Sequence, residues 1–566
     1  MTDYRRARAA PPAAKRLVDA GGRMNDDLTP REDFRPESDP SEKRRSRARP
    51  NGGGNDQRPT IQLRANDIER IVDEAEAALI KADRGLYQRD GKIVCIDSIT
   101  AIAAKGVQVH VQRICERGDH ALREDLCAAA AFQKYDARSK DFVDADPPMT
   151  VVQTLKERSG RLRFPILSGV INAPTMRADG SLLTEPGYDA DTGLLFDPLG
   201  VEFPVIPERP TRKDAEAALA KLKHLIDEFP FVTGAHHAVA LSAILTAVVR
   251  RTLKSAPLHG FTAPVAGSGK GKLVNLCGSI ATGSEVPVTA QANDDEMEKR
   301  LASSLFAGDP IISIDNCTKP VGGNLLCQML TEVTVKPRIL GESKNPTRST
   351  GAFVTSTGQN LKIAADMVRR SIICHLDPKV ERPELREFKI KDLIGFAKAN
   401  RPALVVAVLT ILRAYHVAGY PDAPPRLGSF EEWSDRVRGA LMWLGEADPV
   451  ATMEEIRSDD PELAGMRAVM NAWRETFHSQ SMTVAKILKT ATEQQRSADS
   501  YEGRVEFVNE DLREALMTVA GQGSIISSRA LGNWLSAHKG RIVDGMRFEP
   551  MGERSHATVW MLALDR

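Results

Sequence analysis

The sequence is poor in aromatic residues and has no excess of charge of either sign. Phe, Trp and Tyr make up 5% of its 566 residues, and 77 Lys and Arg balance 76 Asp and Glu. Proteins that bind single-stranded nucleic acid by stacking use aromatic platforms, so stacking is not expected to be a main mode of binding. Because no global positive field exists, any surface that binds nucleic acid must be local.

Cysteine pairs and long apolar runs are also missing. The seven cysteines are scattered and none forms a CxxC pair, which argues against a disulfide framework or a zinc knuckle and favours a reducing cytoplasm. The most apolar stretch, from Ala238 to Val249, is shorter than the roughly 20 residues that a membrane-spanning helix needs. The N-terminus has no apolar signal segment. We therefore expect a cytoplasmic protein with no membrane partner.

Composition and periodicity divide the chain into six segments. The first is rich in Arg, Pro, Asp, Ser and Gly and has too few large apolar side chains to offset its ordering entropy. Apolar spacing predicts a helix from Ile68 to Ala82, and Thr211 with Asp214 three residues later forms a capping-box pattern that predicts another helix start. The predicted segments are a disordered basic tail (1–60), an N-terminal α/β region (61–210), a helical collar (211–254), an α/β core (255–420), a helical region (421–505) and a small C-terminal module (506–566).

A glycine-rich segment at residues 263–271, APVAGSGKG, follows a short apolar run and precedes a helix-like run. The N–H groups of such a turn point at phosphates, and the dipole of the following helix adds positive potential. The segment predicts a nucleotide site in which Lys270 reaches the β- and γ-phosphates. Its predicted members are Ala266, Gly267, Ser268, Gly269, Lys270 and Gly271. Two positions depart from the usual P-loop, because Pro264 replaces a glycine and Gly271 replaces the Ser or Thr that binds Mg²⁺. An ordinary glycine-rich turn is the alternative.

Three further motifs follow in order along the chain. An apolar strand from Pro310 ends at Asp315, an acid that suits Mg²⁺, and a second apolar strand ends at Asn360, whose amide suits an attacking water or a γ-phosphate. Arg369 and Arg370 precede a third strand, and guanidinium groups bind phosphate oxygens bidentately. This order along the chain favours an ATPase over an α/β sheet with chance polar strand ends.

The runs APVAGSGKGKLV, AGDPIISIDN, TSTGQN and DMVRRSIICHLDP resemble the AAA+ ATPases of phage and integrative-element replication, which are related to the third helicase superfamily. The resemblance implies an α/β fold with an AAA+ P-loop core, ATP and Mg²⁺ as cofactors, and a homo-hexamer. It also implies a helicase acting on single-stranded or forked DNA during replication of a mobile element, with a separate primase or initiator. By the same resemblance Asp315 organises the metal, Asn360 is a sensor, and Arg369 or Arg370 is an arginine finger.

Two departures from this family favour ATP binding over hydrolysis. Gly271 removes a metal ligand, and Asn316 stands where an acid often serves as catalytic base. Glu332 or an acid in the segment 294–298 are alternative sources of that carboxylate. A non-hydrolysing ATP-binding scaffold that loads another helicase, and a signalling NTPase that never binds nucleic acid, are therefore alternative functions.

Two segments are predicted to contact DNA. Two short strands flank residues 344–348 and resemble a hairpin that such motors place in a central pore, with Lys344 and Arg348 at its tip gripping phosphates. A merely solvated tip is the alternative. At the C-terminus, two helices followed by two strands have the outline of a winged-helix-like module in which Arg529, Lys539 and Arg541 face DNA. Winged helices also dock proteins.

Overall fold

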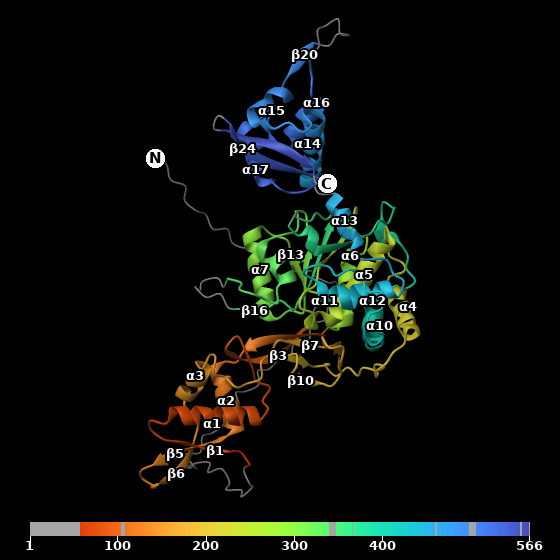
Figure 1. The fold of residues 1–566 in the computed structure, drawn as a ribbon. Helices are drawn as coiled ribbons and strands as arrows, with labels where there is room; N and C mark the ends of the chain where they lie inside the picture. The colour runs from red at the N-terminus through yellow and green to blue at the C-terminus, as the bar shows by residue number, and fades with distance from the viewer. Residues whose placement is uncertain are drawn as a thin grey trace, which may run out of the picture. The chain divides into compact units, whose positions relative to one another are not determined.

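The computed structural model describes residues 57–102, 108–338, 347–364, 366–458, 461–496, 505–554 and 557–564. Arg58–Arg566 is one of the two compact units of the chain, and Figure 1 shows the ribbon of its described residues. The predicted tail at 1–60 therefore lies almost wholly outside the described residues, as does Lys344.

The N-terminal α/β region combines two small sheets with three helices. One sheet has the order β1-β5-β6 and the other β2-β3-β4. Helix α1 confirms the helix predicted from the apolar spacing, and its buried stripe, which includes Ile71 and Leu79, packs against Leu122 and Leu126 of α2. The elements are β1 (Thr60–Leu63), α1 (Ile68–Lys81), β2 (Tyr87–Arg89), β3 (Lys92–Ile102), β4 (Gln108–Glu116), α2 (Asp119–Ala129), β5 (Ala131–Asp136), β6 (Asp141–Ala145) and α3 (Met149–Lys156).

Short strands follow, as the many turn residues of this stretch predict. Gly180 has a φ of +85° and closes the turn between β8 and β9, which pair antiparallel. Asp189 accepts hydrogen bonds from Arg177 and Thr192, so it has a structural role in its own hairpin. The strands are β7 (Gly169–Ile171), β8 (Thr175–Met176), β9 (Leu182–Leu183), β10 (Gly187–Asp189) and β11 (Leu194–Phe196).

Two helices lead into the core. Helix α4 (Arg212–Ile226) begins at the predicted capping box, in which Asp214 N–H donates to the Thr211 hydroxyl and the Asp214 carboxylate accepts from Thr211 N–H. Helix α5 (Gly234–Val249) contains the most apolar stretch of the chain, and most of its residues are buried. Among the described residues no single helix is long and apolar enough to cross a membrane, and one pair bent by 78°, Leu393–Ala399 with Arg401–Val417, passes on length and composition only.

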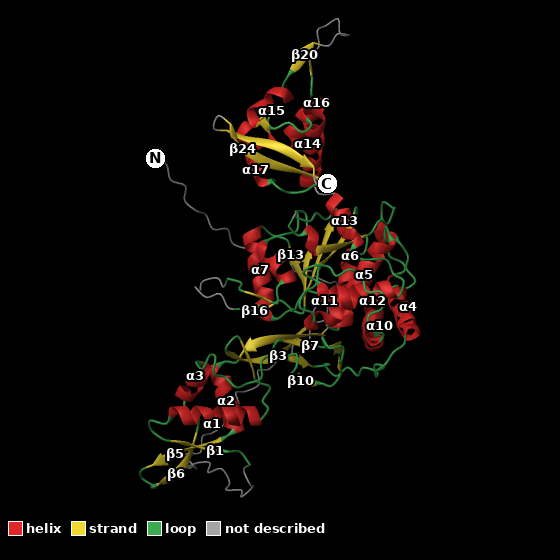
Figure 2. Ribbon diagram, viewed as in Figure 1, coloured by secondary structure: helices red, strands yellow, loops and turns green. Residues whose placement is uncertain are grey.

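The core is a five-stranded parallel sheet in the order β13-β14-β17-β12-β18. Its strands are β12 (Leu258–Ala263), β13 (Val288–Ala290), β14 (Ile311–Asp315), β17 (Phe353–Gln359) and β18 (Ser371–His375). Figure 2 shows them running between α7 and α5. Because all five strands are parallel, their carboxyl ends meet at one edge, where open α/β sheets bind ligands. This mixed α/β fold with a parallel sheet confirms the fold class at that level.

Helices cover the sheet and connect its strands. They are α6 (Lys270–Ala281), α7 (Asp294–Ala307) and α8 (Asn324–Thr331), followed by the short turns η3 (Val368–Arg370) and η4 (Pro383–Leu385) and the helices α9 (Leu393–Ala399), α10 (Arg401–Val417), α11 (Glu431–Trp433), α12 (Gly439–Trp443) and α13 (Ala451–Ser458). Arg401 at the start of α10 donates to Ile280 O and Ala281 O, the last carbonyls of α6. Helix α10 therefore fixes the end of the helix that follows the glycine-rich loop.

The C-terminal module has its own hydrophobic cluster, which runs from Met466 to Leu562. This cluster begins with Met466 in the helix α14 (Pro461–Phe477). The sequence pattern placed the start of the module later in the chain, at residue 506. Ser527 caps α17 by accepting from Ala530 N–H, as its position predicts. The elements are α14 (Pro461–Phe477), β19 (Met482–Thr483), α15 (Val484–Ala491), β20 (Gln494–Arg496), β21 (Val505–Phe507), α16 (Glu510–Ala520), β22 (Gly521–Gln522), β23 (Ile525–Ile526), α17 (Ser528–Ala537), β24 (Met546–Arg554) and β25 (Ala557–Leu564).

Candidate nucleotide-binding site

The glycine-rich loop joins β12 to α6 at the carboxyl edge of the sheet. Gly267 and Gly269 have φ angles of +73° and +94°, and Gly269 is the N-cap of α6. A Cβ on Gly269 would lie 2.7 Å from Phe229 Cε1, so this position requires glycine both for its backbone and for its neighbour. The Ser268 hydroxyl donates to Val265 O at 2.8 Å and fixes the turn. The N–H groups of the loop therefore lie at the N-terminus of α6.

A cavity of about 470 Å³ opens on this loop, and we call it the phosphate cavity. It is lined by three segments that are distant in sequence: the loop and first turn of α6, the end of β14, and the end of β17. Its lining residues are Ala266, Gly267, Ser268, Gly269, Lys270, Gly271, Lys272, Asp315, Asn316, Thr357, Gly358 and Gln359. All six residues predicted from the glycine-rich motif therefore line one cavity with Asp315 and Asn316.

Lys270 lies folded against its own loop. Its Nζ donates to Val265 O at 3.1 Å. Partial burial lowers the pKa of Lys270, and the nearby Asp315 carboxylate opposes that shift. The ammonium is thus close to the cavity and is held by a single backbone carbonyl that an anion can replace.

Thr357 in β17 organises the acid at the end of β14. Its hydroxyl donates to Asp315 Oδ1 at 2.5 Å and accepts from Asn316 N–H at 3.2 Å. Asn316 has a φ of +52°, a conformation that Asn adopts more readily than most residues. We did not predict Thr357 from the sequence, although its place three residues before Asn360 on an apolar strand is a usable signal.

The residues at this edge fit a Mg²⁺ ion held only in part by protein. Asp315 presents one carboxylate, and Gly271 offers no side-chain atom. In the part of the chain that the structure describes, no group of three or more His, Cys, Asp or Glu side chains is placed to hold a metal. Mg²⁺ commonly takes one or two carboxylates and completes its shell with phosphates and water, so a shell of Asp315, phosphates and water fits.

Two predictions, one about the sensor amide and one about a second carboxylate, need correction. Gln359 lines the phosphate cavity, whereas Asn360 is not among the lining residues, because β17 ends at Gln359 and Asn360 follows it in a turn with a φ of +46°. Neither Glu332 nor any acid of the segment 294–298 lines this cavity. Asp315 is thus its only carboxylate among the described residues.

A second cavity of about 270 Å³ shares Gly267, Ser268, Gly269 and Lys272 with the first, and we call it the apolar cavity. Its other walls come from far away in the sequence. They include the apolar residues Leu225, Phe229, Pro230, Phe388 and Ile390 and the charged residues Glu228, Glu384 and Arg386. Aromatic and aliphatic walls beside a phosphate site suit a planar base.

Arg369 and Arg370 lie outside the phosphate cavity of their own chain. Arg369 is exposed on the turn η3 before β18, and Arg370 donates to the backbone carbonyl of Asp366. The Asp366 carboxylate accepts from the Cys327 thiol at 2.9 Å. Neither arginine is therefore placed to contact a nucleotide in the phosphate cavity of its own chain.

The predicted pore hairpin has its two strands, β15 (Thr334–Val335) and β16 (Arg348–Ser349), which pair antiparallel. Arg348 lies within β16 and not at the tip, which corrects its expected position. Its guanidinium pairs with Asp90 and lies 4.6 Å from the centre of the Phe306 ring. Its hydrogen-bonding capacity is thus used partly within the chain.

The basic residues predicted for DNA contact in the C-terminal module differ in whether a neighbouring acid pairs with them. Arg529 and Lys539 are exposed. Arg541 Nη1 lies 2.9 Å from Glu462 Oε1, which His538 Nε2 also contacts at 2.9 Å. Arg541 is therefore partly neutralised by a neighbouring acid.

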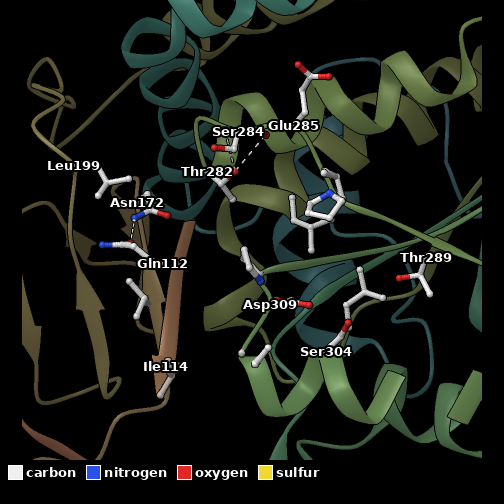
Figure 3. Close-up of a pocket in the computed structure, with 18 residues that line it drawn as sticks. Gln112, Ile114, Asn172, Leu199, Thr282, Ser284, Glu285, Thr289, Ser304 and Asp309 are labelled. Carbon is white, nitrogen blue, oxygen red and sulfur yellow. Dashed lines mark hydrogen bonds between the residues drawn. The ribbon is translucent and has the colours of Figure 1, made fainter. Parts of the chain in front are cut away.

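A third cavity of about 190 Å³ lies between β4 and the loops around α7 (Figure 3). Asn172 Nδ2 donates to Gln112 Oε1 at 2.7 Å on one wall. Burial raises the pKa of Asp309 on another wall, and a hydrogen bond from Ser304 partly opposes the shift. None of the predicted nucleotide-site residues lines this cavity.

Comparison with known proteins finds similar solved structures at low sequence identity. No protein-family model and no curated relative matches the sequence. Among solved structures, the chain is similar to the apo C-terminal region of NrS-1 (12% identity, 78% of this chain and 98% of that one, TM-score 0.33) and to the SCCmec type IV Cch helicase (11% identity, 85% and 97%, TM-score 0.32). It is also similar to JCV helicase (11% identity, 42% and 67%, TM-score 0.20).

Proposed function

We propose that this protein binds ATP at the paired phosphate and apolar cavities and uses it as an AAA+ motor on DNA. One observation carries the proposal: the glycine-rich loop, Asp315 and the end of β17 line one cavity, and the apolar cavity shares residues of the same loop. The five parallel strands bring these segments together at one edge.

In this proposal the loop N–H groups and the N-terminus of α6 hold the phosphates, and Lys270 leaves Val265 O to meet the β- and γ-phosphates. Phe229 and Phe388 cover the two faces of the base. Asp315, kept in place by Thr357, holds Mg²⁺ through its carboxylate. Bound Mg²⁺ would neutralise charge on the phosphate oxygens. Gln359 takes the sensor role expected of Asn360, because it is the amide that lines the cavity.

A nucleotide-binding scaffold that does not hydrolyse ATP is the second candidate. It is favoured by the composition of the phosphate cavity, in which Asp315 is the only described carboxylate and Asn316 occupies the place of a second acid. A scaffold needs binding and release but no general base. It would fit the role of a helicase loader.

The action on DNA rests on the sequence resemblance and on exposed basic residues. Arg529 and Lys539 on the C-terminal module are exposed and suit phosphate contacts, and we propose that this module is a winged-helix-like DNA-binding unit. We propose that Lys344 in the β15–β16 connection grips single-stranded or forked DNA inside a homo-hexamer. Arg369 or Arg370 would then act on the nucleotide of the neighbouring subunit, and a separate primase or initiator would supply priming.

The test is ATP binding and turnover of the purified chain, each measured with and without single-stranded DNA. The motor predicts tight ATP binding and turnover that DNA stimulates, and the scaffold predicts binding without turnover. Lys270→Ala should abolish binding, because it removes the ammonium nearest the phosphates, whereas Lys221→Ala on the exposed face of α4 should change nothing. Unchanged ATP affinity in folded Lys270→Ala would refute the site.

A further inference from the structure

Lys272 occupies a distinctive place at the candidate nucleotide site. It is the third residue of α6, and helical side chains lean toward the N-terminus of their helix. Lys272 lines both the phosphate cavity and the apolar cavity, whereas Lys270 lines only the first. The side chain is exposed, and the Lys272 Nζ lies 5.6 Å from the centre of the Phe388 ring. Its charge therefore stands at the boundary between the two cavities.

The positions around Lys272 are short of metal ligands. Gly271 contributes no oxygen, and one oxygen of Asp315 already accepts from Thr357. A nucleotide brings several negative charges into this cavity, and the described lining residues supply only two cations, Lys270 and Lys272. A weakly held metal leaves more of the phosphate charge to be balanced by protein side chains.

We propose that Lys272 is a second phosphate-binding cation, which binds the nucleotide where its phosphates meet the sugar and base, and that it makes nucleotide binding largely independent of Mg²⁺. This inference rests on the proposed function, since it concerns the same site. The Lys272 ammonium would supply positive charge at the sugar end of the phosphates, so binding would depend less on the metal that a hydroxyl at position 271 would help to hold. The Phe388 ring attracts the Lys272 ammonium and so favours its position beside the cavity.

The experiment measures the affinity of a fluorescent ADP for the full chain, in Mg²⁺ and in EDTA. The wild type should bind with affinities that differ by less than about tenfold between the two buffers. Lys272→Ala should weaken binding about tenfold or more in EDTA, the range of a charge-assisted hydrogen bond, and less in Mg²⁺. Lys272→Arg should keep most of the affinity, and Lys272→Met, which keeps the stem on Phe388, should behave like alanine.

Lys221→Ala and Lys270→Ala serve as controls, and thermal melting shows that each variant is folded. Equal affinity of Lys272→Ala and wild type in both buffers overturns the role of Lys272. Wild-type binding that vanishes in EDTA but is tight in Mg²⁺ overturns the metal independence and leaves ATP binding intact. A folded wild type that binds no ADP in either buffer, or a Lys270→Ala variant that binds normally, overturns the proposed function instead.

Discussion

Restoring a hydroxyl at position 271 is the most direct test of how this site handles Mg²⁺. Gly271 lies in the first turn of α6, and a Cβ built there meets no atom within 4 Å. Its φ is not in the left-handed region, unlike that of Gly269. Serine can therefore enter without displacing a neighbour, and the helix should gain up to about 0.5 kcal/mol because serine has a higher helix propensity than glycine.

The expected gain in metal binding follows from replacing one water ligand by a fixed hydroxyl. Interactions of neutral groups with charged ones contribute about 1.5–3 kcal/mol, and the exchange of one oxygen ligand for another should fall at the low end. About 1.4 kcal/mol corresponds to a tenfold change in affinity. We therefore expect Gly271→Ser to lower the Mg²⁺ concentration at half-maximal nucleotide binding about tenfold.

The assay is a Mg²⁺ titration of ATP binding, followed by fluorescence, with Gly271→Ala as the matched control. Alanine supplies the same Cβ and at least as much helix stabilisation, but no oxygen. If serine and alanine shift the Mg²⁺ midpoint equally, the effect comes from the helix and the reasoning fails. If neither shifts it, Mg²⁺ is not held beside position 271.

Three further predictions address the neighbouring groups. Thr357→Val should lower Mg²⁺-dependent nucleotide binding and destabilise the fold by about 1–3 kcal/mol in denaturant titrations, because Asp315 and the Asn316 N–H lose a hydrogen-bond partner. The matched control is Thr355→Val, which should not lower the free energy of unfolding, because the Thr355 hydroxyl has no partner among the described atoms. Rings that mix Arg369→Ala/Arg370→Ala subunits with P-loop lysine variants should regain part of the ATPase activity, and no recovery between folded, oligomeric partners would exclude action in trans. Burial lowers the pKa of His259 to about 3, below an ordinary value of about 6.5, so between these pH values the unfolded chain binds a proton that the native chain does not. The contribution of His259 to the free energy of unfolding should therefore fall by about 1.4 kcal/mol per unit as the pH is lowered from about 6.5 to 3. His259→Gln should remove this contribution to the slope.

The parts of the site that the sequence predicted are those whose signal is local. The glycine-rich loop needs positive φ angles at Gly267 and Gly269, and an apolar strand that ends in Asp315 needs only a few consecutive residues. Phe229 and Phe388 were missed because each is an ordinary apolar residue in its own segment. Only the folded chain brings them to one cavity beside the loop.

Errors of position arose where the direction of a side chain depends on one residue of register. The pattern of β17 indicated a polar amide at the strand end but could not distinguish Gln359 from Asn360. Similarly, the two strands of the β15–β16 hairpin were expected, yet Arg348 belongs to a strand and not to the connection, because Asp90 and Phe306 in other segments hold its guanidinium. These partners lie 258 and 42 residues away in the sequence and leave no local pattern.

The distribution of charge around the phosphate cavity separates binding from hydrolysis. One chain supplies the loop N–H groups, two lysines and an acid held by Thr357, which together can hold a nucleotide. The same lining contains no arginine, although phosphoryl transfer gains most from a guanidinium aimed at the transferred group. Arg369 and Arg370 stand outside their own cavity, on the turn before β18. Arg386 of the same chain lines only the apolar cavity. We therefore expect the guanidinium needed for turnover to come from a second copy of the chain, and turnover should then depend on assembly while binding should not.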